Sequence, residues 1–216
     1  MAYVSSGNRI GSPSFSLGTE VIATILDILQ VGWSAVLARK VLAPTSQEVD
    51  IAGQLGREVL AEKKRRRISN LRIEEEVGTR ASAQSPKPEG RIDIKVIYSF
   101  DEDEYFGIEC KRVSGNKSDR LARKYVENGM LRFVTGKYSP GHEWAAMMGF
   151  VVDGQTDLSI RLIVDEIAAH KMELGLDGEW MAEMGFSGPS HLYKTGHKQT
   201  HLGTRITILH LFLNLN

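Results

Sequence analysis

The chain has 216 residues, of which 42% are hydrophobic and 25% are charged. This composition is typical of a soluble globular protein with a substantial core. The 27 basic and 27 acidic residues cancel, so bulk charge does not indicate a nucleic-acid-binding protein, and such a surface would have to come from local clusters. The single cysteine, Cys110, excludes an intrachain disulfide and a thiolate-rich metal site, and it fits a reducing cytoplasm.

The N-terminal part of the chain predicts an arm followed by two helices. Residues 1–17 are small and polar and lack the pattern of a secretory signal, so we expect a flexible arm before one domain over residues 18–216. Apolar residues recur at helical spacing from Thr19 to Lys40, and interrupting acidic residues disfavour a membrane span. A second helix is predicted from Ser46 to Arg67.

The middle of the chain is rich in β-branched and aromatic residues. They predict strands over residues 70–79, 92–100 and 105–113. A proline-containing loop over residues 82–90 separates the first two strands. The second and third strands flank the acidic segment Asp101–Glu104 and therefore read as a hairpin.

The rest of the chain alternates between helical and strand patterns. Helices are predicted over residues 119–135 and 157–174, the second with Gly175 as its C-terminal cap. Strands are predicted in order at residues 145–152, 191–195 and 205–215. This order predicts an α/β fold with a mixed central sheet flanked by helices.

The hairpin carries three side chains of chemical interest. Side chains alternate between the two faces of a strand. We therefore expect Ile92, Ile94 and Val96 to share one face and Asp93 to lie on the other. On the next strand, Glu109 and Lys111 share one face, and Cys110 is expected to point away from them into the core.

An aspartate on one strand and a Glu-x-Lys on the next can converge. Two carboxylates held close together repel each other and attract a divalent cation. The ammonium of Lys111 would then lie beside that cation, where it can orient a water molecule or stabilise a developing charge. The alternative is a solvated strand face with a weak ion pair between Glu109 and Lys111.

These residues give the chain a resemblance to the PD-(D/E)xK nuclease superfamily, which has the restriction-endonuclease-like fold. Asp93 matches the aspartate of the motif, and Glu109-Cys110-Lys111 matches its (D/E)xK part. Ile92 stands where the motif usually has proline. The resemblance covers the predicted core over residues 47–152, with residues 153–216 as C-terminal additions.

The resemblance implies a metal-dependent nuclease. Asp93, Glu109 and the backbone carbonyl of Cys110 would bind Mg²⁺ or Mn²⁺, Glu48 from the preceding helix would complete the site, and Lys111 would position the attacking water. DNA is the expected substrate and RNA the alternative. By analogy the protein would act in restriction, phage defence or repair, alone, as a homodimer or with a partner subunit.

A basic region follows the motif, and its residues are candidates for contacts with nucleic-acid phosphates: Arg112, Lys117, Arg120, Arg123 and Lys124. The alternative is an ordinary solvated helix face. The chain has no GxxxxGK[ST] motif, so no P-loop nucleotide site is expected. A second function class also fits the sequence, namely a catalytically inactive subunit that binds nucleic acid or a partner protein.

Three histidines near the C-terminus have simpler interpretations. His197 and His201 are four residues apart, but no helix is predicted there, so a zinc site is disfavoured and a phosphate contact by His197 is the better alternative. His210 lies in the last apolar strand, where a hydrogen-bonded core histidine is expected.

Overall fold

The computed structural model describes residues 17–79, 90–99, 103–186 and 189–215. The predicted N-terminal arm lies outside the described residues except for Leu17, which packs against the core. The predicted loop over residues 82–90 and the tip of the acidic turn also lie largely outside them.

The helices and strands follow the predicted order along the chain. The helices are α1 (Thr19–Arg39), α2 (Glu48–Arg65), the 3-10 helix η1 (Lys117–Asp119), α3 (Leu121–Tyr125), the π-helical turn η2 (Val126–Met130), α4 (Leu131–Val134) and α5 (Thr156–Ala169). The strands are β1 (Arg72–Thr79), β2 (Gly90–Ile97), β3 (Tyr105–Val113), β4 (Trp144–Val151), β5 (Met181–Ala182), β6 (Leu192–Lys198) and β7 (Arg205–Asn214).

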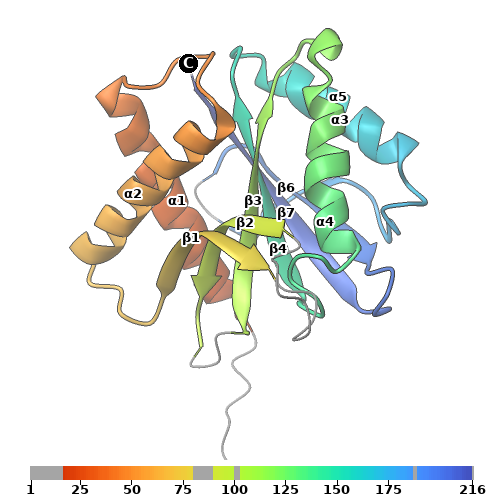
Figure 1. The fold of residues 1–216 in the computed structure, drawn as a ribbon, viewed down its shortest axis with the longest axis horizontal. Helices are drawn as coiled ribbons and strands as arrows, with labels where there is room; N and C mark the ends of the chain where they lie inside the picture. Colours follow the sequence, from red (N-terminus) through yellow and green to blue (C-terminus); the bar gives the residue numbers. More distant parts are fainter. Residues whose placement is uncertain (1–16, 80–89, 100–102, 187–188, 216) are drawn as a thin grey trace, which may run out of the picture.

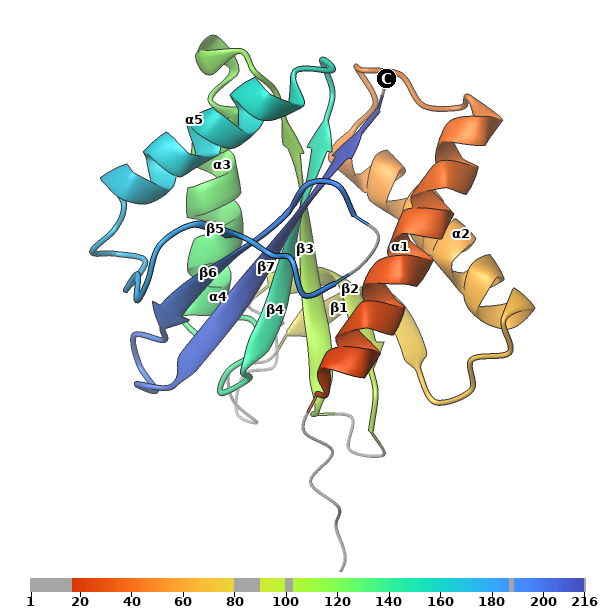
Figure 2. The same cartoon turned by 180° about the vertical axis from the view of Figure 1, so that it is seen from behind.

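Within the described residues, the strands form one mixed sheet of seven strands in the order β1-β2-β3-β4-β7-β6-β5. The neighbours β3–β4 and β4–β7 are parallel, and the remaining neighbours are antiparallel. Helices α1 and α2 cover one face, and the α3–α4 helix together with α5 covers the other (Figures 1 and 2). The prediction of an α/β fold with a mixed sheet between helices is confirmed.

Each face of the sheet has its own apolar core. One core joins α1 and α2 to the sheet, and the other joins α3, α4 and α5 to it. Helix α1 is long and apolar enough to cross a membrane by length and composition, but eight of its residues are buried in this structure. Its Trp33 stacks on Phe150 of β4 and donates a hydrogen bond of 3.0 Å to the carbonyl of Asn214.

Two predicted helices end or break differently from the prediction. The helix predicted over residues 119–135 is interrupted by the π-helical turn η2. The helix predicted over residues 157–174 ends at Ala169, so Gly175 does not cap it. The chain turns away early because Leu174 and Gly175 bond to the neighbouring strand: their carbonyls accept from His197 Nδ1 and from the backbone N–H of Lys198.

The prediction for the faces of β2 is wrong at one residue. Ile94 and Val96 pack in the α1–α2 core as expected, but Ile92 packs in the α3–α5 core. The change of face occurs where backbone pairing between the two strands stops, because β2 pairs with β3 only over Ile94–Ile97. Asp93 therefore stands where the two strands separate.

Candidate metal-binding and catalytic site

Strand β3 supplies two charged side chains to a buried position. Phe106, Ile108 and Cys110 point into the α1–α2 core, which confirms Cys110 as a core residue. Glu109 and Lys111 take the alternate positions toward the α3–α4 helix and are 1% and 8% exposed. Buried charges are costly unless they are paired and hydrogen-bonded, so their partners determine what this site can do.

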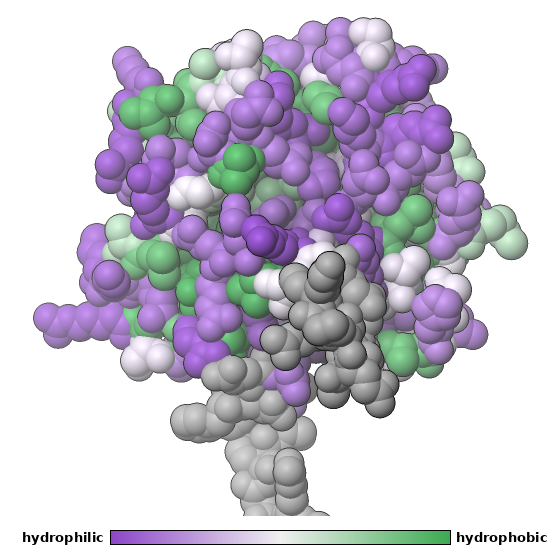
Figure 3. Space-filling model, viewed as in Figure 1, coloured by the Kyte–Doolittle hydropathy of each residue, from purple (hydrophilic) through white to green (hydrophobic). Residues whose placement is uncertain are grey.

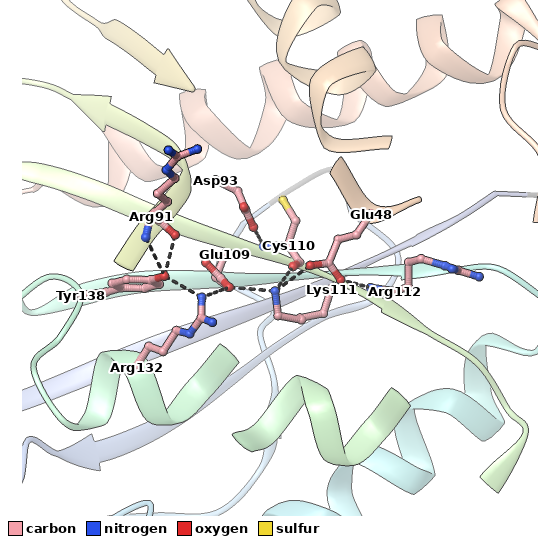
Figure 4. A network of polar contacts seen from close by, with 9 residues as sticks. All are labelled: Glu48, Arg91, Asp93, Glu109, Cys110, Lys111, Arg112, Arg132 and Tyr138. Carbon is pink, nitrogen blue, oxygen red and sulfur yellow. Dashed lines mark hydrogen bonds and ion pairs between the residues drawn. The ribbon is translucent and has the colours of Figure 1, made fainter. Parts of the chain in front are cut away.

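The ammonium of Lys111 is fully hydrogen-bonded within the protein. Its Nζ donates to Oε1 of Glu109 and to Oε1 of Glu48, each at 2.8 Å, and to the carbonyl oxygen of Cys110 at 2.7 Å (Figure 4). An ammonium has three donors, so all of them are used. Lys111 therefore joins the carboxylates of two different elements.

Glu48 reaches this cluster from the first residue of α2. Its second oxygen, Oε2, accepts a hydrogen bond of 3.0 Å from the backbone N–H of Arg112, which fixes the carboxylate at the edge of β3. The other glutamates of α2 that could have served pair elsewhere, Glu58 with Arg39 and Glu62 with Arg65. Of these three glutamates of α2, Glu48 is the one that joins the cluster.

Asp93 faces β3 from the point where β2 leaves it. Its Oδ2 accepts a hydrogen bond of 2.6 Å from the backbone N–H of Cys110, which replaces a hydrogen bond of the sheet ladder. This bond orients the carboxylate beside Glu109. The structure thus brings Asp93, Glu109 and Lys111 together, as the alternation of the two strands predicts.

Glu109 has one satisfied oxygen and one unsatisfied oxygen. Oε1 accepts from Lys111 and also from Nη1 of Arg132 at 3.0 Å. Oε2 is buried, and it has no hydrogen-bond partner among the described residues. A buried carboxylate oxygen without a partner is costly and marks a place where a proton or a cation would be favourable.

The electrostatics of the three residues follow from this arrangement. Burial, followed by the nearby charge of Asp93, raises the pKa of Glu109 to about 7. Burial also raises the pKa of Asp93 above its usual value. Burial alone would lower the pKa of Lys111, but the carboxylates of Glu109 and Glu48 outweigh it and raise that pKa, so the lysine stays protonated at neutral pH.

A π-helical turn brings the covering helix close to Lys111. Gly129 lies within η2, and a Cβ at this position would stand 2.3 Å from the terminal methyl of Met147 and 3.6 Å from Cγ of Lys111. Glycine therefore allows the helix to pack directly over the site. Turns of this kind occur frequently at functional sites.

The cluster contains the oxygen ligands typical of a divalent-cation site, but these ligands do not surround a common position. Within the described residues, no group of three or more His, Cys, Asp or Glu side chains is arranged to hold a metal ion. The ammonium of Lys111 lies between two of the carboxylates, with its Nζ 2.8 Å from Oε1 of Glu48 and 2.8 Å from Oε1 of Glu109.

The donor set nevertheless fits Mg²⁺ or Mn²⁺, because the ligands that these ions prefer are carboxylate and carbonyl oxygens. Three carboxylates, those of Glu48, Asp93 and Glu109, meet two cations, those of Lys111 and Arg132. When all three carboxylates are ionised, one negative charge has no counterpart within the cluster. The unsatisfied Oε2 of Glu109 is the oxygen that would gain most from a cation.

The predicted phosphate-contacting residues do not all surround this site. Lys117, Arg120 and Arg123 line a groove of about 430 Å³ against α5, which also exposes acidic side chains there. Arg123 pairs with Glu127 on its own helix at 2.7 Å. Lys124 is exposed on α3. The face of the molecule that presents α2 and α4 is mainly hydrophilic with scattered hydrophobic residues (Figure 3).

Arg112 is held against the α1–α2 loop. Its side chain donates to the carbonyl of Pro44 at 3.0 Å, while its backbone N–H binds Glu48. It therefore supports the position of Glu48.

The C-terminal histidines form no metal site. His197 is fully buried, with contacts to Thr195 and to the carbonyl of Leu174, whereas His201 is exposed. Burial also removes His197 as a phosphate contact. His210 is a hydrogen-bonded core residue, as predicted, with Tyr125 and Thr195 as its partners.

Two residues of the site were not predicted. Arg132 contacts Glu109, and Tyr138 contacts Arg132 through a hydrogen bond of 2.6 Å. Arg132 is a further basic residue after the motif, but its spacing from Glu109 matches no recognisable pattern. Tyr138 lies beside a proline–glycine break and gives no signal in the sequence.

Comparison of the chain with models of protein families, with curated proteins and with solved structures found no match.

Proposed function

We propose that this protein is a divalent-metal-dependent nuclease that hydrolyses phosphodiester bonds of DNA. The observation that carries the proposal is the convergence of Asp93, Glu109 and Lys111 at a buried position, with one carboxylate oxygen of Glu109 unsatisfied. Buried ionisable groups with raised pKa values cluster at functional sites more often than elsewhere.

Asp93 and Glu109 would hold Mg²⁺ or Mn²⁺, with the Cys110 carbonyl and Glu48 as further oxygen donors. The bound cation would act as a Lewis acid toward the scissile phosphate. Both carboxylates must be ionised for this role, and the raised pKa of Glu109, about 7, makes binding depend on pH near neutrality.

Lys111 would act as a hydrogen-bond donor and not as a general base. Its neighbours raise its pKa, so at neutral pH the side chain is an ammonium that can orient a water molecule and stabilise negative charge on the phosphate. To do this it must give up one of its three present hydrogen bonds. The bond to Glu48 is the most exposed, because the Glu48 side chain is 36% exposed.

The topology around the site supports a restriction-endonuclease-like core between residues 47 and 152. Antiparallel strands β1, β2 and β3 are followed by the α3–α4 helix and by β4, which lies parallel to β3. Such a core would place the site on a central strand. A role in restriction, phage defence or repair in a reducing cytoplasm follows by analogy with nucleases of this kind.

The alternative is a catalytically inactive subunit that binds nucleic acid or a partner protein. The observation that favours it is the complete use of the Lys111 donors inside the protein, which lets the cluster persist as a structural ion-pair network.

Cleavage of supercoiled and linear DNA in Mg²⁺, Mn²⁺ or EDTA separates the two functions. The proposal expects metal-dependent cleavage by the wild-type chain and none by Glu109→Gln, with retained activity in Glu58→Gln. Glu58 is a suitable control because it is also a paired glutamate but lies away from the cluster. Anomalous scattering from Mn²⁺-soaked crystals should place the ion between Asp93 and Glu109. No cleavage and no bound Mn²⁺ would favour the inactive subunit.

A further inference from the structure

The strands that carry the two carboxylates are not joined by the sheet at the site itself. Backbone pairing between β2 and β3 covers Ile94–Ile97 opposite Tyr105–Ile108 and stops before Asp93 and Glu109. Beyond this point, the hydrogen bond from the Cys110 N–H to Asp93 spans the separation. Other contacts must therefore help to set the distance between Asp93 and Glu109.

Tyr138 and Arg132 provide such contacts. The Tyr138 hydroxyl donates to the carbonyl of Arg91 at 2.5 Å and accepts from the N–H of Arg91 at 3.2 Å. The same hydroxyl accepts from Nη1 of Arg132 at 2.6 Å, and Nη1 also donates to Oε1 of Glu109 at 3.0 Å (Figure 4). A continuous chain of hydrogen bonds thus runs from the backbone of β2 to the carboxylate on β3.

The Tyr138 hydroxyl and Nη1 of Arg132 use all their hydrogen-bonding positions in this network. A tyrosine hydroxyl has one donor and two acceptor positions, and Arg91 and Arg132 take all three. Nη1 of an arginine has two hydrogens, which Glu109 and Tyr138 take. The Tyr138 side chain is buried, and the arginine group packs over its ring at 5.3 Å. Such saturated, partly buried networks hold one geometry.

The hydrogen-bond network also determines which oxygen of Glu109 stays without a partner. Because Lys111 and Arg132 both bind Oε1, the carboxylate is held with Oε2 as the oxygen left without a partner. Arg91, the anchor on the other strand, lies two residues before Asp93. The network therefore binds the Glu109 carboxylate directly and holds the backbone of β2 two residues before Asp93.

We propose that Arg132 and Tyr138 are positioning residues that clamp β2 to β3 and thereby set the spacing of Asp93 and Glu109 for a divalent cation. The inference rests on the proposed function where it concerns the cation. The clamp itself concerns only the geometry of this chain. Two variants test it. Tyr138→Phe removes one oxygen and keeps the ring. Arg132→Lys keeps the positive charge but removes the planar guanidinium and its Nη1, the nitrogen that binds both Glu109 and Tyr138.

A matched control is available in the same region. The hydroxyl of Tyr105 is also buried, and it accepts a hydrogen bond of 3.1 Å from the N–H of Ser139. Tyr105→Phe therefore removes a comparable hydroxyl that is not part of the clamp. Any effect common to Tyr138→Phe and Tyr105→Phe reports a general loss of packing or hydrogen bonding.

Mn²⁺ binding to the full chain, followed by electron paramagnetic resonance, is the first measurement. Tyr138→Phe and Arg132→Lys should each weaken Mn²⁺ binding about tenfold or more, the usual effect of losing a partner that orients a metal ligand. Tyr105→Phe should bind like the wild type. At saturating Mn²⁺ the cleavage rate of Tyr138→Phe should recover most of its value, because the reacting groups are all present.

Amide hydrogen exchange is the second measurement, and it requires neither metal nor activity. In Tyr138→Phe the amide of Cys110, which binds Asp93, should exchange about fivefold faster, the factor expected from losing one ordinary hydrogen bond. Unchanged exchange at Cys110 would overturn the clamp whatever the function of the protein. Faster exchange in a chain that binds no Mn²⁺ would keep the clamp and reject the proposed nuclease.

Discussion

Replacing Lys111 by methionine should destabilise the metal-free protein strongly and in a pH-dependent way. Methionine keeps most of the aliphatic stem that packs beside Gly129 and removes the ammonium, so the change isolates the charge. The lost donor serves Glu109, which is 1% exposed, and the carbonyl of Cys110. Breaking a buried ion pair by removing one partner costs about 3–5 kcal/mol.

The cost should depend on the protonation of Glu109. The pKa of this carboxyl is already about 7 with Lys111 in place, and loss of the neighbouring cation can only raise it. At pH 6 the Glu109 carboxyl of the variant is neutral, so the loss of its counterion costs less stability. At pH 8.5 a larger fraction of this carboxyl would be ionised without a counterion, so the cost is larger. We expect a loss of about 3 kcal/mol at pH 8.5, equivalent to a decrease in Tm of roughly 6–12 °C for a domain of this size.

Thermal unfolding in EDTA, followed by circular dichroism at both pH values, is the assay. Lys194→Met is the matched control because Lys194 also pairs with a glutamate, Glu183, but its side chain is 33% exposed. That change should cost no more than about 1 kcal/mol. If Lys111→Met unfolds at the wild-type temperature at pH 8.5, the view of Lys111 as the counterion of a buried carboxylate is refuted.

Further predictions concern catalysis, pH and binding. Lys111→Ala should lower the single-turnover cleavage rate about a hundredfold or more, with a much smaller change in DNA affinity measured in Ca²⁺; equal losses would recast it as a phosphate anchor. Asp93→Asn should abolish cleavage and lower the pKa of Glu109, which a carboxyl NMR titration would report; an unchanged pKa would contradict their coupling. Because the folded pKa of Glu109, about 7, lies above the usual 4.5, its contribution to stability is fully present below pH 4.5 and is lost as pH rises through 7. The difference in Tm between wild type and Glu109→Gln across this range should follow that curve. Replacing Arg120 and Lys124 together with alanine should flatten the log–log salt dependence of DNA affinity by about one per lost phosphate contact; an unchanged slope would leave them as solvated surface residues.

The order of elements could be read from the sequence because each has a strong local pattern. The heptad-like stripe of α1, the alternation in β3 and the continuous apolar run of β4 all depend on residues close in the chain. The early end of α5 could not be read in this way, since contacts with β6 about 23 residues later decide it. The two-residue strand β5 has too short a pattern to be recognised.

The candidate site likewise contains residues that a local pattern predicts and residues that depend on tertiary contacts. Asp93, Glu109 and Lys111 lie on neighbouring strands, so their convergence follows from alternation and the hairpin. Ile92 departs from strict alternation and packs in the other core, at the point where β2 no longer pairs with β3. The extent of that pairing is a tertiary feature, which the local pattern of β2 does not show. Arg132 and Tyr138 lie 23 and 29 residues after Glu109. No pattern in a single sequence links residues at these separations, so their contacts with the site could not be predicted.

The short pairing between β2 and β3 also determines how the candidate site should come apart on partial unfolding. The antiparallel pair of β1 and β2 is attached to the rest of the sheet over four residue pairs, while β3, β4 and β7 are paired along nearly their full length. The β1–β2 pair is therefore expected to open as a separate cooperative unit at a lower denaturant concentration than the parallel strands. Its opening would carry Asp93 away and leave Glu109 and Lys111 in place. The proposed nuclease activity would then be lost while most of the helix and sheet signal persists.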